Sequence, residues 1–288
     1  MKKKNKLPIS IVIPTLGHNH LIKCLNKIYL GSFLPSEVLI VVPKENYLKN
    51  FNFKSFFPNL NLIIILSKKK NQVFQRIMGF KKAKNIYVMQ LDDDVELDKE
   101  CLYDLYKFIK GRQDVAVAPR YSNKINLSSI YKKPKNFLNK FYHWLINSSK
   151  GYSPGNISLS GFNYSEENRL FGYKYHEWLS GGAIIHNKKN LILENYYPFN
   201  FYKSFCEDIL HSLILRKKKI KLIKFFGAKV SAESGKIVDN PNIIKIFRDL
   251  YSEFLIRRYI VEKFKFSKFR LNIYYLIYTI RILIRICR

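Results

Sequence analysis

The chain has 288 residues, enough to bury a large core in one domain or in a domain with an appendage. Its 47% hydrophobic content excludes a disordered protein, and its four dispersed cysteines argue against structural zinc and favour a reducing compartment. The net charge of +30 either attracts an anionic partner, such as nucleic acid, acidic lipid or a phosphorylated substrate, or reflects biased coding composition. No signal peptide is expected, because the apolar run after the Met-Lys-Lys-Lys start is short and is interrupted by Pro14.

Short apolar runs alternate with helical patterns over the first 120 residues. Continuous runs typical of buried parallel strands lie at 9–13, 38–42, 62–66, 86–91 and 115–118. Helical patterns lie between them, at about 21–29, 72–84 and 99–110. This alternation predicts βαβ units, and hence a Rossmann-like α/β fold with a mostly parallel sheet flanked by helices.

The second half of the chain has a weaker pattern. Residues 121–176 are rich in Asn, Ser, Gly and aromatic residues, and we interpret them as loops and irregular elements over a binding face. Further on, the sequence predicts a short strand within 178–185, a helix at about 207–218, a strand at 220–226 and a helical, amphipathic segment at 243–288. We therefore expect a domain over residues 1–240, in two halves (1–120 and 121–240), and a basic amphipathic helical extension over 241–288.

Three adjacent carboxylates, Asp92, Asp93 and Asp94, follow the fourth predicted strand. Ligands of open α/β sheets collect at the carboxyl ends of the strands. Carboxylate oxygens suit Mg²⁺ or Mn²⁺, and a bound cation would relieve the repulsion between the three side chains. The alternative is a cluster that caps the next helix. The position after a buried strand favours the cation site.

A second acidic pair, Glu207 and Asp208, opens the helix predicted at 207–218. Carboxylates at the start of a helix complement its dipole. One of them could equally be the general base of a reaction whose leaving group is held by the aspartate triplet. Residue types alone leave both interpretations open.

Four segments, taken in order, resemble the landmarks of family 2 glycosyltransferases with the GT-A fold. They are ISIVIPTLGHNHLIKCL, QVFQRIMGFKKAKNIYVMQLDDDVEL, EWLSGGAII and FCEDILHSLILRKKKIKL, and the resemblance covers roughly residues 8–226. It implies transfer of a sugar from a nucleotide-diphosphate donor, of the UDP type, to an acceptor hydroxyl with inversion at the anomeric carbon. Residues 1–120 would then be the nucleotide-binding half, and residues 121–240 the acceptor-binding half.

The resemblance also implies roles for residues on the nucleotide side. Pro14, Thr15 and Arg76 match positions near the nucleotide. Asp92 and Asp94 match the Asp-X-Asp motif, with Asp92 expected near the ribose and the metal and Asp94 on the metal. Asp93, in the middle position, can support either role. The implied cofactor is a divalent cation, Mg²⁺ or Mn²⁺.

On the sugar side, Trp178, Gly181 and Gly182 match the segment that borders the acceptor and the donor sugar. A glycine there permits close approach of the backbone. Asp208 matches the catalytic base, which takes a proton from the acceptor hydroxyl, and Glu207 is its neighbour.

Two departures from the family pattern stand out. After the second strand, where many members hold the base or ribose with an acidic residue, the sequence is VVPKEN and only Glu45 could serve. After the last strand, where many members carry a histidine, the sequence is GAKVSAESG. The base specificity is therefore open, and the protein's metal ligand set is expected to be small.

The segment from Lys245 to Arg288 carries eleven Lys or Arg and three Asp or Glu. Its longest charge-free apolar stretch, 273–280, is shorter than the about 20 residues of a spanning helix. A basic amphipathic helix on an anionic leaflet fits, and so does a helix packed on the domain or on a partner. We expect a cytoplasmic enzyme, peripheral at the inner face of the cell membrane, which glycosylates a glycan or a lipid-linked acceptor in surface polysaccharide or glycolipid synthesis.

Other functions remain as alternatives. A metal-dependent nucleotidyl- or phosphotransferase also suits an Asp-X-Asp after a parallel strand, but it leaves the glycine pair and the Glu-Asp helix unexplained. A catalytically inactive nucleotide-sugar-binding relative is disfavoured, because Asp92, Asp94 and Asp208 are all present. Only the charge suggests nucleic acid, and no recognisable binding module accompanies it, so no nucleic-acid partner is expected.

Overall fold

The computed structural model describes residues 4–17, 19–48, 53–122, 134–165, 171–201, 203–232 and 242–286. The chain divides into two compact units. The first comprises Met1–Ile125 and Arg169–Gly235, and the second comprises Asn126–Asn168 and Lys236–Arg288. The sequence-based boundaries differ from this grouping, because they placed all of 121–240 in one half of the domain expected over 1–240.

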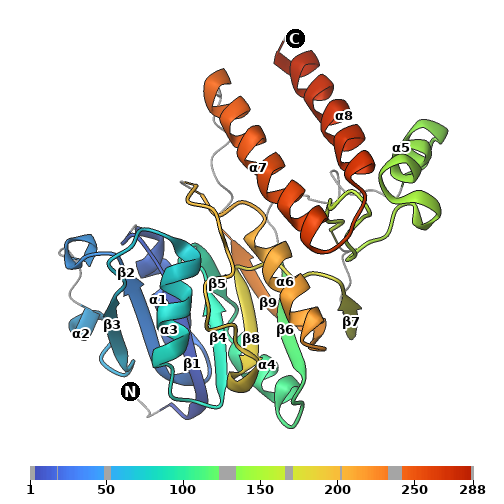
Figure 1. The fold of residues 1–288 in the computed structure, drawn as a ribbon. Helices are drawn as coiled ribbons and strands as arrows, with labels where there is room; N and C mark the ends of the chain where they lie inside the picture. Colours follow the sequence, from blue (N-terminus) through green and yellow to red (C-terminus); the bar gives the residue numbers. More distant parts are fainter. Residues whose placement is uncertain are drawn as a thin grey trace. The chain divides into compact units, whose positions relative to one another are not determined.

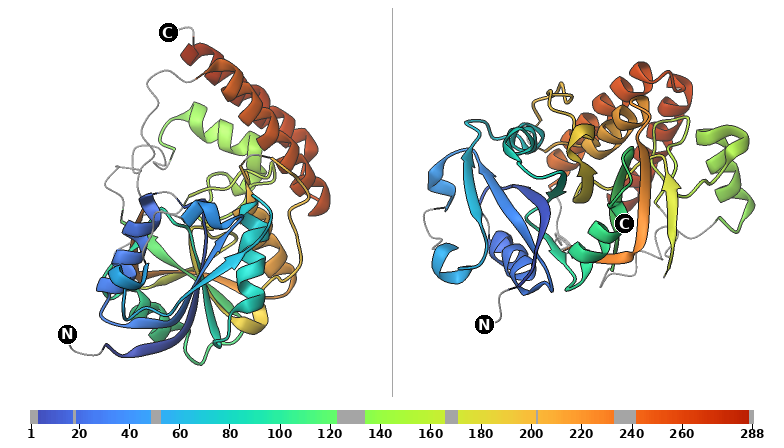
Figure 2. Two further views of the ribbon diagram at one scale, coloured as in Figure 1. Left: turned by 90° about the vertical axis from the view of Figure 1, so that its left-hand side faces the viewer. Right: turned by 90° about the horizontal axis from the view of Figure 1, so that it is seen from below.

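The first unit is built on a twisted sheet with the strand order β3-β2-β1-β4-β8-β6-β9-β5 (Figures 1 and 2). Four strands at one side are parallel: β1 (Lys6–Pro14), β2 (Leu34–Val42), β3 (Leu62–Leu66) and β4 (Tyr87–Leu91). The helices between them are α1 (Asn19–Leu30), α2 (Phe53–Phe56) and α3 (Gln72–Lys82), with a short 3₁₀ turn, η1 (Glu45–Leu48). Each strand predicted in this region is present, with its ends moved by a few residues at most.

The other side of the sheet mixes directions. Strand β8 (Ala183–Asn187) runs antiparallel between β4 and β6 (Val115–Tyr121), and β6 runs parallel to β9 (Lys221–Ala232). The short strands β5 (Val95–Leu97) and β7 (Tyr173–His176) each pair antiparallel with β9. The helices α4 (Cys101–Ile109) and α6 (Glu207–Lys217) and the 3₁₀ turn η4 (Lys188–Asn190) complete this unit. The predicted α/β fold with a mostly parallel sheet flanked by helices is confirmed.

The central strands β1, β2 and β4 are buried on both faces of the sheet, which explains why they read as continuous apolar runs. On one face, Ile9, Ile11 and Ile13 of β1 pack in a single core with buried residues of α1 and α4. On the other face, Val12 packs with Phe80 of α3. Side chains of a strand point alternately to the two faces, so a strand covered on both sides needs apolar residues at every position.

The second unit is helical. It consists of α5 (Phe137–Asn147), a 3₁₀ turn η3 (Ser148–Lys150), α7 (Ile243–Lys263) and α8 (Lys268–Ile286), and α7 and α8 form a hairpin (Figure 1). Its core joins Ile146 of α5 to Val261 of α7 and to Leu271, Tyr274 and Tyr275 of α8. The helical tail is therefore two helices, and α5 packs against them, which is why 126–168 groups with the carboxyl-terminal residues. No helix within the described part of the chain has the length and apolar character to cross a membrane.

The interpretation of 121–176 as loops is wrong where α5 and β7 lie. Apolar residues of α5 recur at helical spacing (Phe137, Leu138, Phe141, Trp144 and Leu145), and the Asn136 side chain caps the helix by accepting from the Asn139 N–H at 2.9 Å. That signal is present in the sequence, although asparagine and lysine surround it. The four residues of β7 carry no comparable signal, because pairing with β9 makes them a strand.

Candidate functional site

The aspartate triplet and the glycine pair lie side by side because β8 runs antiparallel to β4. Leu91, the last residue of β4, pairs with Ala183, the first residue of β8. Directly beyond this pair, the Asp92 N–H donates to the Gly182 carbonyl at 2.8 Å. Segments that are about 90 residues apart in the sequence therefore meet at the carboxyl end of β4.

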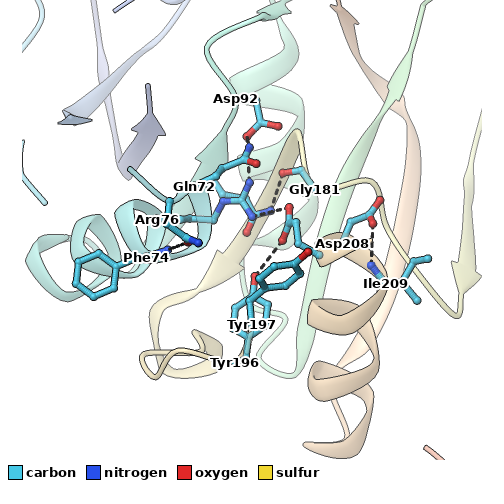
Figure 3. A network of polar contacts seen from close by, with 12 residues as sticks. Gln72, Phe74, Arg76, Asp92, Gly181, Tyr196, Tyr197, Asp208 and Ile209 are labelled. Carbon is cyan, nitrogen blue, oxygen red and sulfur yellow. Dashed lines mark hydrogen bonds and ion pairs between the residues drawn. The ribbon is translucent and has the colours of Figure 1, made fainter. Parts of the chain in front are cut away.

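The three aspartates have different surroundings. Asp92 Oδ1 accepts from Gln72 Nε2 and Arg76 Nη2, both at 3.0 Å (Figure 3). Asp93 accepts from the hydroxyl of Thr15, so it ties the triplet to the end of β1. The Asp94 side chain is exposed. Asp94 is therefore the member of the triplet that is most open to a ligand from solution.

Arg76 lies between two carboxylates from different elements. Its side chain is 1% exposed, and it donates from Nη1 to Glu207 Oε1 at 2.8 Å as well as from Nη2 to Asp92. Burial disfavours its charge, but the Glu207 and Asp92 carboxylates raise the pKa of Arg76 above its ordinary value. The guanidinium thus stays charged and links α3, the triplet and the start of α6.

Glu207 has a second partner on the loop before α6. The Tyr196 hydroxyl donates to Glu207 Oε2 at 3.0 Å, and Tyr196 packs against His211 of α6 (Figure 3 shows Tyr196). Burial lowers the pKa of His211 to about 3, so its ring is neutral beside this network. Both Glu207 oxygens are engaged, and Glu207 is buried.

Burial raises the pKa of Asp92 to about 6. The positive charge of Arg76 lowers this pKa, but the effect of burial is larger, and the negative charges of Glu207 and Asp94 add to the rise. A cation close to Asp92 and Asp94 would favour their ionised forms.

Gly181 lies directly against the Glu207 carboxylate. A Cβ atom on Gly181 would come within 2.5 Å of Glu207 Oε1, which Arg76 holds in place. The Gly181 carbonyl accepts from Gln90 Nε2 at 2.7 Å. This position therefore needs a glycine for space.

Asp208 lies in the first turn of α6, beyond a strained residue. Cys206, just before the helix, has a φ of 51°, a left-handed conformation that costs a non-glycine residue about 1–2 kcal/mol. Asp208 is half-buried, and its Oδ1 accepts from the Ile209 N–H at 2.9 Å (Figure 3). Trp178, also half-buried, precedes Leu179, whose N–H donates to Ser212 Oγ of α6 at 3.0 Å.

Tyr121, at the end of β6, is a residue that the sequence analysis missed. Its hydroxyl hydrogen-bonds with the Ser180 side chain. Burial raises its pKa well above the ordinary value, and the charges of Asp92, Asp94 and Asp208 raise it further. The phenol is therefore neutral, and it lies against Gly182, since a Cβ on Gly182 would come within 2.5 Å of the Tyr121 hydroxyl oxygen and 3.6 Å of Asp92 Oδ2. No motif marked it, because its position follows from the pairing of β6 with β8 and β9.

The predicted metal ligands fit a cation that is shared with a substrate. Among the described residues, no cluster of three or more His, Cys, Asp or Glu is arranged to hold a metal ion. Mg²⁺ in nucleotide sites is commonly bound by one or two carboxylates plus substrate phosphates. Exposed Asp94 and the partly exposed Asp92, 23% accessible at its side chain, supply such oxygens.

A double-mutant cycle tests the contact between Gly182 and the Tyr121 hydroxyl. A Cβ on Gly182 would lie 2.5 Å from the Tyr121 hydroxyl oxygen, so Gly182→Ala is expected to lower the free energy of unfolding by about 1–3 kcal/mol. In a Tyr121→Phe background the clash is relieved, and the same alanine should cost clearly less. Urea unfolding of the four proteins measures the coupling. Equal costs in both backgrounds would mean that the two residues are not in contact.

The comparisons with known proteins identify the family. A family model described as glycosyl transferase family 2 matches residues 10–171, more than half of the chain. The chain belongs to this family. The matched segment includes Thr15, Arg76 and the aspartate triplet, and it ends before Trp178 and Asp208. A search of curated proteins finds no match.

Two solved structures are similar to this chain, and the first of them has a related fold. The structure of GalNAc-T7 with UDP, GalNAc and Mn²⁺ is 15% identical and superposes with a TM-score of 0.54 over 78% of this chain and 43% of that chain. A structure of residues 1–349 of TarS from S. aureus is 15% identical, with a TM-score of 0.46 over 78% of this chain and 60% of that chain. The family 2 glycosyltransferase thus spans about half the length of these neighbours. The predicted family, the GT-A type of fold and the transferase class are confirmed.

Proposed function

We propose that this family 2 glycosyltransferase transfers a sugar from a nucleotide-diphosphate donor to an acceptor hydroxyl, with inversion and with a divalent cation on the diphosphate. The observation that carries the proposal is the glycine pair between the two sets of carboxylates: a Cβ on Gly182 would lie 3.6 Å from Asp92 Oδ2, and a Cβ on Gly181 would lie 3.4 Å from Asp208 Cβ. A carboxylate suited to a cation and a carboxylate suited to a proton are thus close to one small region. An inverting transfer needs the cation-binding carboxylate and the proton-accepting carboxylate at the same time, because the leaving group departs as the acceptor hydroxyl attacks from the opposite face.

On the nucleotide side, Pro14, Thr15 and Asp93 are proposed to border the donor at the end of β1. The hydrogen bond from Thr15 to Asp93 supports this, since it fixes the end of β1 relative to the triplet. Arg76 is buried, so its proposed part is to hold Asp92 at the nucleotide through the bond at 3.0 Å. The bound cation would neutralise negative charge on the diphosphate.

On the sugar side, Asp208 is the proposed general base. Its carboxylate would take the proton from the acceptor hydroxyl as that oxygen attacks the anomeric carbon. Gly181 and Gly182 keep the space beside it free of side chains, and half-buried Trp178 borders the same segment. Glu207 is proposed to fix the position of this segment, because its carboxylate lies against Gly181. Both carboxylate oxygens of Glu207 are themselves held by hydrogen bonds, from Arg76 and from Tyr196.

The donor, the acceptor and the location are also proposals. A UDP-type donor is supported by the fold shared with GalNAc-T7, whose structure contains UDP and Mn²⁺. The acceptor is proposed to be a glycan or a lipid-linked glycan in surface polysaccharide or glycolipid synthesis. Peripheral contact with the inner face of the cell membrane is proposed for residues 241–288, which are basic and partly apolar.

Thermal stabilisation by nucleotide sugars tests the donor and the cation together. A ligand at about 100 times its Kd stabilises the folded state by about 2.7 kcal/mol. A UDP-sugar with Mn²⁺ should therefore raise the Tm, and chelation by EDTA should remove most of the rise. Asp94→Ala should lose the Mn²⁺-dependent part, while the control Asp98→Ala, also at an exposed aspartate, should keep it. An unchanged response of Asp94→Ala would refute the role of Asp94, and no response to any nucleotide sugar would refute the donor class.

A further inference from the structure

The second unit has an apolar surface on α5 that is largely exposed among the described residues. Phe137, Leu138, Phe141 and Trp144 are 77%, 74%, 46% and 49% exposed, and we refer to these four residues as the aromatic ridge. The opposite side of α5 is part of the core, where Ile146 is fully buried and Tyr142 packs against the same cluster. α5 is therefore apolar on two sides, and only one of them is needed for folding.

The ridge is an ordered array. The rings of Phe137 and Phe141 are stacked with centroids 6.1 Å apart, and those of Phe141 and Trp144 are stacked at 5.8 Å. At its end, the Arg270 guanidinium of α8 lies over the Trp144 ring at 5.8 Å and donates to the Trp144 carbonyl at 2.8 Å. A run of large exposed apolar groups on one helix face is typical of an interaction surface.

Charge indicates what the ridge contacts. Residues 134–147 contain two lysines and residues 264–286 contain five Lys or Arg, and neither segment contains an Asp or a Glu. A second copy of this chain would meet the same positive charge, so self-association is opposed. An anionic bilayer attracts the charges and accepts the apolar groups beneath its headgroups.

The neighbouring helix has the same character. Phe269, next to Arg270, is 74% exposed, and Leu276, Ile280 and Leu283 follow on the outer face of α8. The inner face of α8 is occupied by Leu271, Tyr274 and Tyr275 in the core. By contrast, Glu262 at the end of α7 pairs with Arg258 and with Lys268, the first residue of α8. The acid-free apolar surface therefore lies on α5 and α8.

We propose that the aromatic ridge of α5 inserts into the interfacial region of an anionic phospholipid bilayer, with Lys140 and Arg270 at the level of the headgroups. This inference builds on the membrane contact proposed for residues 241–288, and it assigns the inserting side chains to a different element. Tryptophan and phenylalanine favour this depth, and lysine and arginine extend their charged ends towards the headgroups.

Trp144 itself can report the insertion, because the chain has only two tryptophans. In a full-length Trp178→Phe protein, emission comes from Trp144 alone. Adding vesicles of phosphatidylcholine with phosphatidylglycerol should shift the emission to the blue, and brominated acyl chains should quench it. Vesicles of phosphatidylcholine alone should produce little change, because the electrostatic attraction is missing.

Variants of the ridge complete the test. Phe137→Ser with Phe141→Ser changes two exposed side chains, so the Tm should hold, while partition onto the anionic vesicles should fall by at least about tenfold. The matched control is Phe56→Ser, at a phenylalanine that is 64% exposed in the first unit and should leave partition unchanged.

Each remaining outcome contradicts a specific claim. Equal partition of the wild type and the double variant, with Trp144 emission unchanged, overturns the role of the ridge and leaves the proposed membrane contact of 241–288 standing. No association with any vesicle overturns both. If sedimentation without lipid shows a dimer that the double variant abolishes, the ridge is a contact between copies. None of these results bears on the proposed sugar transfer.

Discussion

Replacing Arg76 by methionine is expected to lower the free energy of unfolding by about 3–5 kcal/mol, because the change leaves two carboxylates without their cationic partner. Glu207 is buried and Asp92 is partly buried, and both accept from the same guanidinium. Urea unfolding measures the loss. Adding Glu207→Gln to Arg76→Met should recover part of it, since one of the two unpaired charges is then removed.

Arg216 supplies the matched control. Its side chain is 40% exposed, and it lies 3.4 Å from the Glu177 carboxylate, also in the first unit. Arg216→Met is expected to cost at most about 1 kcal/mol, as is usual for an exposed ion pair. If the two arginine variants were destabilised equally, the buried network would not be a special source of stability.

Replacing Asp208 by asparagine is expected to reduce sugar transfer by about 10²–10⁴-fold without weakening donor binding. The amide has the shape of the carboxylate, and its oxygen can still accept from the Ile209 N–H, so α6 should begin as it does in the wild type. The amide, however, cannot take a proton from the acceptor hydroxyl. Transfer is measured as release of the nucleotide from the donor selected by thermal stabilisation, and donor affinity is measured by calorimetry.

Asp114→Asn is the control for this change, because Asp114 is an exposed aspartate paired with Lys189. It should leave both transfer and donor affinity unchanged. A weaker donor affinity in Asp208→Asn, in place of slower transfer, would mean that Asp208 binds the donor and that the base lies elsewhere.

The central strands of the first unit, β1, β2 and β4, could be predicted because they are buried on both faces. β3 occupies the residues expected for it, 62–66, and β1 and β2 extend the predicted runs at one or both ends. The predicted runs of β1 and β2 are almost entirely apolar, because both faces of the sheet are covered there. The run of β3 is equally apolar, although Ile64 and Leu66 are exposed in this edge strand. The short strands β5 and β7 could not be predicted, because they exist through pairing with β9, a contact between distant parts of the sequence.

Sequence motifs located the candidate site but not its connections. The triplet and the Glu-Asp pair are visible as charges, and their order along the chain matched a family. The bonds from Arg76 to Asp92 and Glu207 join residues up to 131 positions apart, and no spacing rule predicts them. Tyr121 illustrates the same limit. A tyrosine at the end of a strand is common, and only the pairing of three strands brings its hydroxyl against Gly182, beside Asp92.

The second unit is assembled from two stretches of chain that are separated by Arg169–Gly235 of the first unit. Arg270 and Trp144, which hold α8 against α5, are 126 residues apart. Contacts of such long range form late, because the entropy of closing the loop is lost before the contact stabilises the fold. During synthesis α5 emerges long before α8, so its inner face, with Tyr142 and Ile146, has no native partner until the last helix is made. The first unit is therefore expected to fold first, and α5 should be the part of the nascent chain most dependent on chaperones.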